Sequence, residues 1–308
     1  MSRQATDPCP QMRVVRTVAE LRGQLAPARR AGSRIGLVPT MGALHEGHLS
    51  LIRHARAHCD VVVVSLFVNP AQFNEQGDLD RYPRDERRDG ELAAAAGADL
   101  LFAPTVEEVY PPGFATSVEV LGVSERLEGE SRGAEHFRGV ATVVTKLLLM
   151  ALPDVAYFGR KDAQQVVVIR RLVADLNIPV SVEALPTVRD PDGLAMSSRN
   201  ALLAPQQRER ALALSRALDD VRRLAESGER SAQALLAAGH ETLQDAGVAL
   251  DYLALVDPDT FEPLERLEGP ALLAVAARVG QVRLIDNVTL EPSALTPHDR
   301  KAAQACSA

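Results

Sequence analysis

Cysteine is scarce in this sequence, which argues against a disulfide-bonded scaffold and against a structural zinc site. The three cysteines, Cys9, Cys59 and Cys306, are scattered along a chain of 308 residues, without the pair spacing that either kind of site requires. An excess of positive charge is also missing. The 34 Lys and Arg residues are outnumbered by 41 Asp and Glu residues, for a formal net charge of −7, and this balance disfavours a general nucleic-acid-binding protein.

The sequence also lacks an apolar stretch suited to a membrane. Its longest apolar runs, residues 61–68 and 141–152, are too short or too polar to cross a bilayer. The first residues are polar and include Pro8 and Pro10, so we expect no signal peptide. A hydrophobic content of 46% and a charged content of 24% are ordinary for a soluble globular protein. We therefore predict a cytoplasmic protein with no membrane partner, long enough for two domains.

Hydrophobic periodicity predicts an α/β architecture for the first half of the chain. Residues 61–68 are apolar almost throughout, as in a parallel strand that is covered on both faces. We expect strands at residues 34–39, 61–68, 100–103, 118–121, 155–158 and 179–183, and helices at residues 17–31, 85–96, 141–151 and 164–176, with one more from about His48. Strands that alternate with helices predict a Rossmann-like, doubly wound parallel sheet.

The pattern changes after residue 187. Turn residues at 190–193 are followed by two predicted helices, at 205–226 and 232–246, and by three closely spaced strands, at 249–256, 271–279 and 282–285. This half is typical of a small α+β domain. We expect domains at residues 1–187 and 188–292, with a loose leader at 1–12 and a disordered tail at 293–308.

The glycine-bearing loop between the first predicted strand and its helix has the features of a phosphate site. Backbone N–H groups at a helix start, with the positive end of the helix dipole behind them, form a seat for phosphate. His45 and His48, separated by Glu46 and Gly47, can face one ligand there. Surface histidines or a metal pair are the alternatives. Because the loop lacks both G-x-G-x-x-G and G-K-[ST], we expect a nucleotide bound by another route.

A polar stretch at residues 124–139 contains Arg126, Arg132, His136 and Arg138. Its composition is compatible with a flexible flap over the site and equally with a solvated loop.

Four separated motifs fall at strand ends or loops: residues 39–48, 69–73, 159–165 and 196–200. Together with Asp80-Arg-Tyr-Pro-Arg84, they resemble the pantothenate synthetases, and the resemblance extends to about Val288. Residues 39–48 are similar to the family's form of the H-x-G-H motif of nucleotidyltransferases. The resemblance implies an ATP-dependent ligase that joins pantoate to β-alanine through a pantoyl adenylate, and a homodimer formed through the first domain.

The resemblance also implies the roles of individual residues. His45, His48, Lys161, Ser197, Ser198 and Arg199 would act on the phosphates, with His48 as the proton donor. Further ATP contacts would come from Pro39, Thr40, Met41, Gly42, Ala43, Leu44, Glu46, Gly47, Gly159, Arg160, Asp162, Val188 and Met196. Pantoate would be bound by Met41, Asn69, Gln72 and Gln165. Mg²⁺ would be held mainly by the ATP phosphates, with Asp162 or, more weakly, Asp89 as a protein ligand.

The sequence departs from the family pattern at a few positions. Arg160 replaces an acid or glutamine, Ala163 an aromatic residue and Ala71 a methionine, and the segment from Arg132 to His136 is one residue longer than usual. We expect activity to survive these changes, with any loss in pantoate binding.

Two alternative functions stay open at this point. The protein could be another H-x-G-H nucleotidyltransferase, which keeps AMP on its product, or a nucleotide-binding homologue impaired in catalysis. Taken alone, Lys161 is more often an exposed lysine, and residues 196–200 are as readily a helix-capping loop.

Overall fold

The computed structural model describes residues 12–73 and 76–292. The chain divides into two compact units, one made of Met1–Val188 with Met196–Ser198 and the other of Arg189–Ala195 with Arg199–Ala308. Residues 1–11 of the predicted leader and the whole predicted tail at 293–308 lie outside the described residues.

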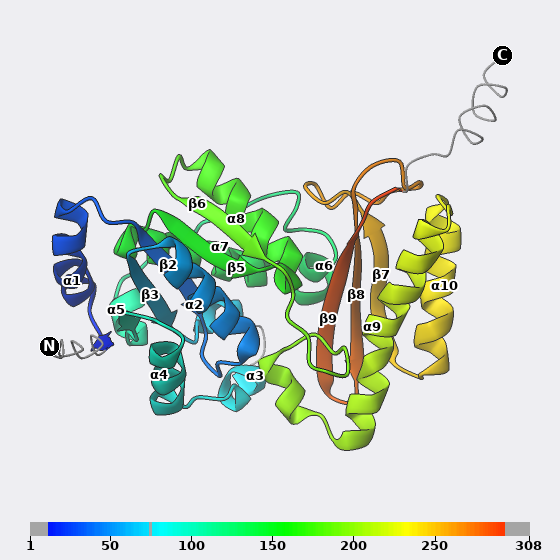
Figure 1. The fold of residues 1–308 in the computed structure, drawn as a ribbon, viewed down its shortest axis with the longest axis horizontal. Coiled ribbons are helices and arrows are strands. Elements are labelled where there is room, and N and C mark those ends of the chain that lie inside the picture. Colours follow the sequence, from blue (N-terminus) through cyan, green and yellow to red (C-terminus); the bar gives the residue numbers. More distant parts are fainter. Residues whose placement is uncertain (1–11, 74–75, 293–308) are drawn as a thin grey trace, which may run out of the picture. The chain divides into compact units, whose positions relative to one another are not determined.

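The first unit is built on a six-stranded parallel sheet in the order β1-β4-β3-β2-β5-β6 (Figure 1). Its strands are β1 (Arg13–Val15), β2 (Ile35–Thr40), β3 (Val61–Leu66), β4 (Leu100–Phe102), β5 (Val155–Gly159) and β6 (Ser181–Leu185). From β2 the sheet grows through β3 and β4 to one side and through β5 and β6 to the other, which confirms the predicted doubly wound sheet. The direction reverses between β2 and β5, and ligands of such sheets bind at the carboxyl ends of the strands beside this reversal.

Helices cover this sheet because alternate strand residues are apolar on both faces. The helices of the unit are α1 (Val18–Arg30), α2 (Glu46–His58), α3 (Gln76–Arg81), α4 (Glu86–Ala95), α5 (Val106–Val109), α6 (Glu128–Arg132), α7 (Ala134–Ala151) and α8 (Ala163–Asp175). Val62 and Val64 are buried in one cluster with residues of α2 and α4. Val63, between them, is also buried, and its side chain points to the opposite face of the strand. Elsewhere in the unit, α7 packs with α1 and α8. The reading of residues 61–68 as a strand covered on both faces is therefore confirmed for 61–66.

One predicted strand, at residues 118–121, is wrong. The backbone N–H of Val118 is bonded by the side-chain hydroxyl of Thr142 at 2.9 Å, not by a neighbouring strand. Leu121 is 71% exposed. The segment therefore runs beside α7 as irregular chain.

The polar stretch at residues 124–139 is not a solvated loop. It contains α6 and the start of α7, and within it Glu128 and His136 are only 7% and 8% exposed. The buried amide of Gln164 on α8 holds it, because Nε2 donates to the carbonyl oxygens of Val123 and Arg126 and Oε1 accepts the N–H of Glu128. Polar composition concealed this order, since Glu128, Arg132 and His136 have partners inside the protein.

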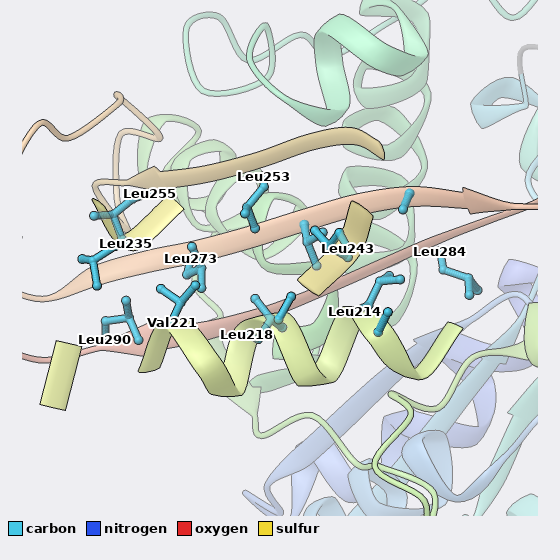
Figure 2. Packing of buried hydrophobic residues seen from close by; sticks show 14 of the residues in the cluster. Leu214, Leu218, Val221, Leu235, Leu243, Leu253, Leu255, Leu273, Leu284 and Leu290 are labelled. Carbon is cyan, nitrogen blue, oxygen red and sulfur yellow. The ribbon is translucent and has the colours of Figure 1, made fainter. Parts of the chain in front are cut away.

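The second unit packs two helices against a three-stranded antiparallel sheet in the order β7-β8-β9. Its elements are α9 (Pro205–Glu226), α10 (Ala232–Asp245), β7 (Ala249–Val256), β8 (Ala271–Val279) and β9 (Val282–Leu290). Figure 2 shows Leu214, Leu218 and Val221 of α9 pointing into the core that they share with the strands. The predicted α+β character is confirmed, and β9 continues past residue 285 because residues 286–290 pair with the start of β8.

A search of the described helices finds none that is long and apolar enough to cross a membrane.

Candidate active site

The loop between β2 and α2 is fixed by a buried carboxylate. Oδ2 of Asp89 accepts the backbone N–H of Ala43 at 2.8 Å, and Oδ1 accepts that of Leu44 at 2.7 Å. Asp89 is 1% exposed and lies in the first turn of α4. Gly42 and Ala43 both have positive φ, at 87° and 51°, so the loop makes a turn that most residues disfavour. The clamp by Asp89 therefore holds the loop in an unusual conformation.

The backbone N–H groups of this loop are not left pointing outward, as the phosphate-seat interpretation expected. The N–H of Gly42 is bonded by the Thr40 hydroxyl, and those of Ala43 and Leu44 by Asp89. The N–H of His45 is bonded by His48. Because these donors have partners inside the protein, a phosphate group would meet side chains before it met this part of the backbone.

His45 and His48 cap the start of α2 for each other. His45 is the N-cap residue, and its Nδ1 accepts the N–H of Gly47 at 3.2 Å. Nδ1 of His48 accepts the N–H of His45 at 3.4 Å, and the two ring centroids lie 4.1 Å apart. A backbone N–H can only donate, so in the neutral ring each proton sits on Nε2. The pair therefore offers two Nε2–H donors.

Gly47 has no room for a side chain, because a Cβ there would lie 2.9 Å from the ring of His45 and 3.9 Å from Cβ of Met196. The nearer constraint in the structure is the His45 ring.

His48 stays neutral over an unusually wide range of pH. Desolvation of the ring, followed by the positive charges of His45 and Lys161, lowers the pKa of His48 to about 3, against the opposing effect of Asp162. Lys161 and Asp162, which follow Gly159 at the end of β5 directly, are thus close enough to influence the His48 ring electrostatically. Nζ of Lys161 lies 3.4 Å from Oδ1 of Asp162, and the lysine side chain is only 18% exposed. The reading of Lys161 as an ordinary exposed lysine is therefore wrong.

Arg160, beside the lysine, is exposed, and its Nε donates to the carbonyl oxygen of Ala184 on β6 at 3.1 Å. This bond directs the guanidinium group of Arg160, which departs from the family pattern, toward β6.

Gln72 lies in the short 3₁₀ turn Pro70–Gln72 that follows β3. Its Oε1 accepts from Nδ2 of Asn69 at 3.1 Å, and its Nε2 lies 2.9 Å from Sδ of Met41. Three of the four residues expected to bind pantoate are therefore in contact with one another. Asn69 is itself buried, at 1% exposed. The fourth, Gln165, is half-buried in the first turn of α8.

Of the polar stretch, His136 lies beside Gln72, and Arg132 lies beside His136. The carbonyl oxygen of Gln72 lies 2.9 Å from Nδ1 of His136, which must donate because a carbonyl only accepts. Burial, with the charge of Arg132, lowers the pKa of His136 to about 4. Arg132 pairs with Glu128 at 2.9 Å.

The serine motif is divided between the two units. Met196, Ser197 and Ser198 belong to the first unit, whereas Arg199 belongs to the second. The N–H of Met196 donates to the carbonyl oxygen of Val188 at 3.0 Å. Ser198 lies 3.5 Å from the hydroxyl of Tyr82, a tyrosine of the Asp80-Arg-Tyr-Pro-Arg84 motif to which the sequence reading gave no role.

Several other loop residues expected to contact ATP face the protein interior. Thr40 and Leu44 are 8% and 1% exposed, and the Thr40 hydroxyl donates to the carbonyl oxygen of Ser65 at 2.8 Å. Pro39 and Met41 are half-buried, and Glu46 is exposed. Among the described residues, no group of three or more His, Cys, Asp or Glu side chains could hold a metal ion.

A doubly wound sheet whose central β2–α2 loop carries paired Nε2–H donors, with a lysine at the end of the adjacent strand, defines a phosphate-binding α/β protein of the H-x-G-H kind. The family model described as pantoate-beta-alanine ligase matches residues 13–289. The chain belongs to this family. The family and the ligase activity expected from the sequence are thus confirmed.

Individual relatives agree over almost their full length. The pantothenate synthetase of Moorella thermoacetica is 54% identical over 281 residues, which are 91% of this chain and 99% of that protein. The crystal structure of pantothenate synthetase from Thermus thermophilus has a TM-score of 0.86 and 49% identity, and covers 92% of this chain and 100% of its own. A pantoate-beta-alanine ligase from Francisella tularensis, complexed with beta-gamma ATP and beta-alanine, has a TM-score of 0.75 and 36% identity, with 90% and 97% covered.

Proposed function

We propose that the ligation proceeds in two steps around the β2–α2 loop. A carboxylate oxygen of pantoate attacks the α-phosphorus of ATP, pyrophosphate leaves, and the amine of β-alanine then displaces AMP from the pantoyl adenylate. The observation that carries this proposal is the pair of Nε2–H donors on His45 and His48, with Lys161 close enough to affect the pKa of His48. The Francisella relative, complexed with an ATP compound and β-alanine, supports the choice of these substrates.

Negative charge develops on the phosphates as the first step proceeds. Donors already fixed in place stabilise such charge without having to reorganise. We assign this task to the Nε2–H groups of His45 and His48, and to Lys161 as a point charge. With a pKa of about 3 before ATP binds, His48 donates a hydrogen bond at neutral pH, and phosphate charge nearby would raise that pKa.

Pantoate would be held by the amides of Gln72 and Gln165, with Met41 beside the first of them. Met196, Ser197, Ser198 and Arg199 would contact the phosphates, and the backbone at Val188 would contact adenine. Arg199 belongs to the second unit.

For the second step we assign no protein base. Holding the amine and the adenylate in attack geometry can supply roughly 7 kcal/mol or more of the barrier reduction.

Mg²⁺ would be held mainly by the ATP phosphates, where it neutralises charge. Asp162 is the better of the two carboxylates considered, because its side chain is 47% exposed beside Lys161. Both oxygens of Asp89 already accept backbone N–H groups. The homodimer and the cytoplasmic location remain predictions.

The experiment that tests the two-step proposal is pantoate-dependent exchange of labelled pyrophosphate into ATP, measured before β-alanine is added. Exchange that requires pantoate is the expected result. Exchange without pantoate would instead indicate a nucleotidyltransferase acting on another acceptor. If the full substrate mixture yields no AMP while ATP still protects the protein against heat, the chain is a binding homologue without catalysis.

A further inference from the structure

The side chain of Asn69 is a buried junction between three parts of the first unit. Its Oδ1 accepts the N–H of Ala71 at 3.2 Å and the hydroxyl of Tyr110 at 2.8 Å. Its Nδ2 donates to Oε1 of Gln72 and to the carbonyl oxygen of Gly139, both at 3.1 Å. Two lone pairs and two N–H groups are thus all used, which is the full capacity of an amide.

The orientation of the Asn69 amide follows from backbone groups whose polarity cannot change. The N–H of Ala71 can only donate, so the atom that faces it must be the oxygen of Asn69. The carbonyl of Gly139 can only accept, so the atom that faces it must be the nitrogen. It follows that the Tyr110 hydroxyl donates its proton to Asn69.

The orientation of the Asn69 amide also determines the orientation of the Gln72 amide. Because Nδ2 of Asn69 is a donor, the atom of Gln72 that it meets must be the acceptor Oε1. Nε2 of Gln72 then points away from Asn69 and contacts the thioether sulfur of Met41, which is a weak acceptor. A carboxylate or hydroxyl oxygen would be a stronger partner for these N–H groups.

The backbone of the turn is held as well. His136 donates to the carbonyl oxygen of Gln72. At Gly139 on α7, a Cβ would lie 2.1 Å from the carbonyl oxygen of Ala71 and 2.9 Å from the nitrogen of Gln72. The helix therefore touches the turn directly, and Gln72 has little freedom to move.

We propose that Tyr110 is a positioning residue: by donating to Asn69, it helps to fix the Gln72 amide with Nε2 toward the substrate, where it takes an acceptor oxygen of pantoate. This inference rests on the proposed role of Gln72 in binding pantoate. The Gln72 amide then serves pantoate as a donor only, since Oε1 is already engaged by Asn69.

The surroundings of Tyr110 keep its hydroxyl available as a donor. Burial raises the pKa of Tyr110 to about 12, so the hydroxyl retains its proton at neutral pH. The ring packs against Phe67 and Phe114, with centroid distances of 6.1 and 5.1 Å. Tyr110→Phe keeps these ring contacts and removes only the hydrogen bond.

The test is a double-mutant cycle on pantoate-dependent pyrophosphate exchange, with wild type, Tyr110→Phe, Gln72→Ala and the double variant. Loss of one hydrogen bond to a buried side chain should raise the pantoate KM of Tyr110→Phe about fivefold, with the ATP KM unchanged. In the Gln72→Ala background the same substitution should change the pantoate KM less than about twofold, because coupled residues are not additive.

Tyr157→Phe is the matched control. Tyr157 is fully buried in β5, and its hydroxyl lies 3.3 Å from Sγ of Cys59, so this variant loses a buried hydroxyl of the same unit without touching Asn69. Its pantoate KM should equal that of wild type.

The outcomes distinguish the proposed role of Tyr110 from the proposed role of Gln72. If Tyr110→Phe has the same effect in both backgrounds, Tyr110 does not act through Gln72 and the inference is wrong, although Gln72 keeps its role. If Gln72→Ala leaves the pantoate KM unchanged, the proposed role of Gln72 fails and the inference fails with it.

Gln72→Glu tests the direction of the amide by a second route. The substitution leaves an oxygen to accept from Asn69 and replaces the Nε2 donor by a further oxygen. It should raise the pantoate KM at least as much as Gln72→Ala does. Wild-type binding by Gln72→Glu would mean that an oxygen, and not Nε2, faces the substrate.

Discussion

Nδ1 of His48 lies 3.4 Å from the backbone nitrogen of His45 and accepts its N–H. With its pKa lowered to about 3 by desolvation and by neighbouring positive charge, the His48 ring should keep a single proton on Nε2 in the ligand-free protein. We expect ring ¹⁵N shifts to report this tautomer unchanged from about pH 8 to about pH 5. A titration of His48 near the ordinary value of 6.5 would show that the ring charges in this range.

Lys161→Ala should lower turnover about 100- to 1000-fold, the loss seen when one fixed donor to a developing negative charge is removed. The fold should survive, because the ion pair of Lys161 is a 3.4 Å contact to the adjacent, 47% exposed side chain of Asp162, and such exposed pairs add little stability. Steady-state kinetics and thermal unfolding measure the two effects.

Arg160→Ala removes the neighbouring cation, which binds Ala184, and should keep turnover within a fewfold of wild type. Equal losses in the two variants would remove the special role of Lys161.

Asp89→Asn should loosen the β2–α2 loop. One of the two backbone N–H groups, of Ala43 or Leu44, would face an NH₂ group in place of an oxygen, and an unsatisfied buried donor costs about 1–3 kcal/mol. We expect a lower free energy of unfolding in urea and a lower turnover, with an unchanged dependence on Mg²⁺ concentration. If the variant instead needs much more Mg²⁺ and loses no stability, Asp89 is a metal ligand.

Asp85→Asn is the control for this change. Asp85 is exposed and caps the same helix by accepting the N–H of Arg88 at 3.0 Å. Asparagine caps helices about as well as aspartate, so this variant should retain both stability and turnover.

His136 should make the protein sensitive to acid. Burial and Arg132 lower its pKa to about 4, although the bond to Gln72 and the charges of Glu128 and Asp162 oppose this. Between its ordinary value of 6.5 and about 4, the unfolded chain binds a proton that the folded chain does not. Stability therefore falls as the pH decreases through this range, by about 3 kcal/mol from this residue.

Urea unfolding at about pH 7 and about pH 4 measures that loss. In His136→Gln, which keeps a side-chain donor but cannot be protonated, the decrease in the free energy of unfolding should be smaller. The exposed His240 supplies the control, since His240→Gln should follow wild type. If the two variants show the same pH dependence, His136 is not the source.

Sequence reasoning located the parts of the fold that depend on local apolar patterning. The valine run of β3 and the alternating helices define the doubly wound sheet, and the bounds of α9, β7 and β8 match the predicted ranges. The same reasoning missed β1, whose three residues pair with β4 across the sequence. It also placed a strand at 118–121, because an apolar segment does not reveal that the Thr142 hydroxyl bonds the Val118 N–H.

The residues of the site were predicted from motifs. The motifs could not predict which groups each side chain bonds. His45 and His48 were expected to assist a backbone phosphate seat, whereas the loop N–H groups have partners within the protein. The amides of Asn69 and Gln72 were expected to bind substrate together, yet the two N–H groups and the oxygen of the Asn69 amide are already fully hydrogen-bonded by protein groups. Tyr110 carried no sequence signal, because its link to Asn69 joins residues 41 positions apart.

The closed set of bonds in the β2–α2 loop also determines what ATP binding must accomplish there. Hydrogen bonds from Asp89 and within the histidine pair hold the loop, so little conformational entropy remains to be lost when phosphates arrive. Amide hydrogens of Ala43, Leu44 and His45 should therefore exchange slowly with deuterium in the unliganded protein, and ATP should protect them little further. The affinity for ATP then depends on a loop conformation that is already formed when the protein folds.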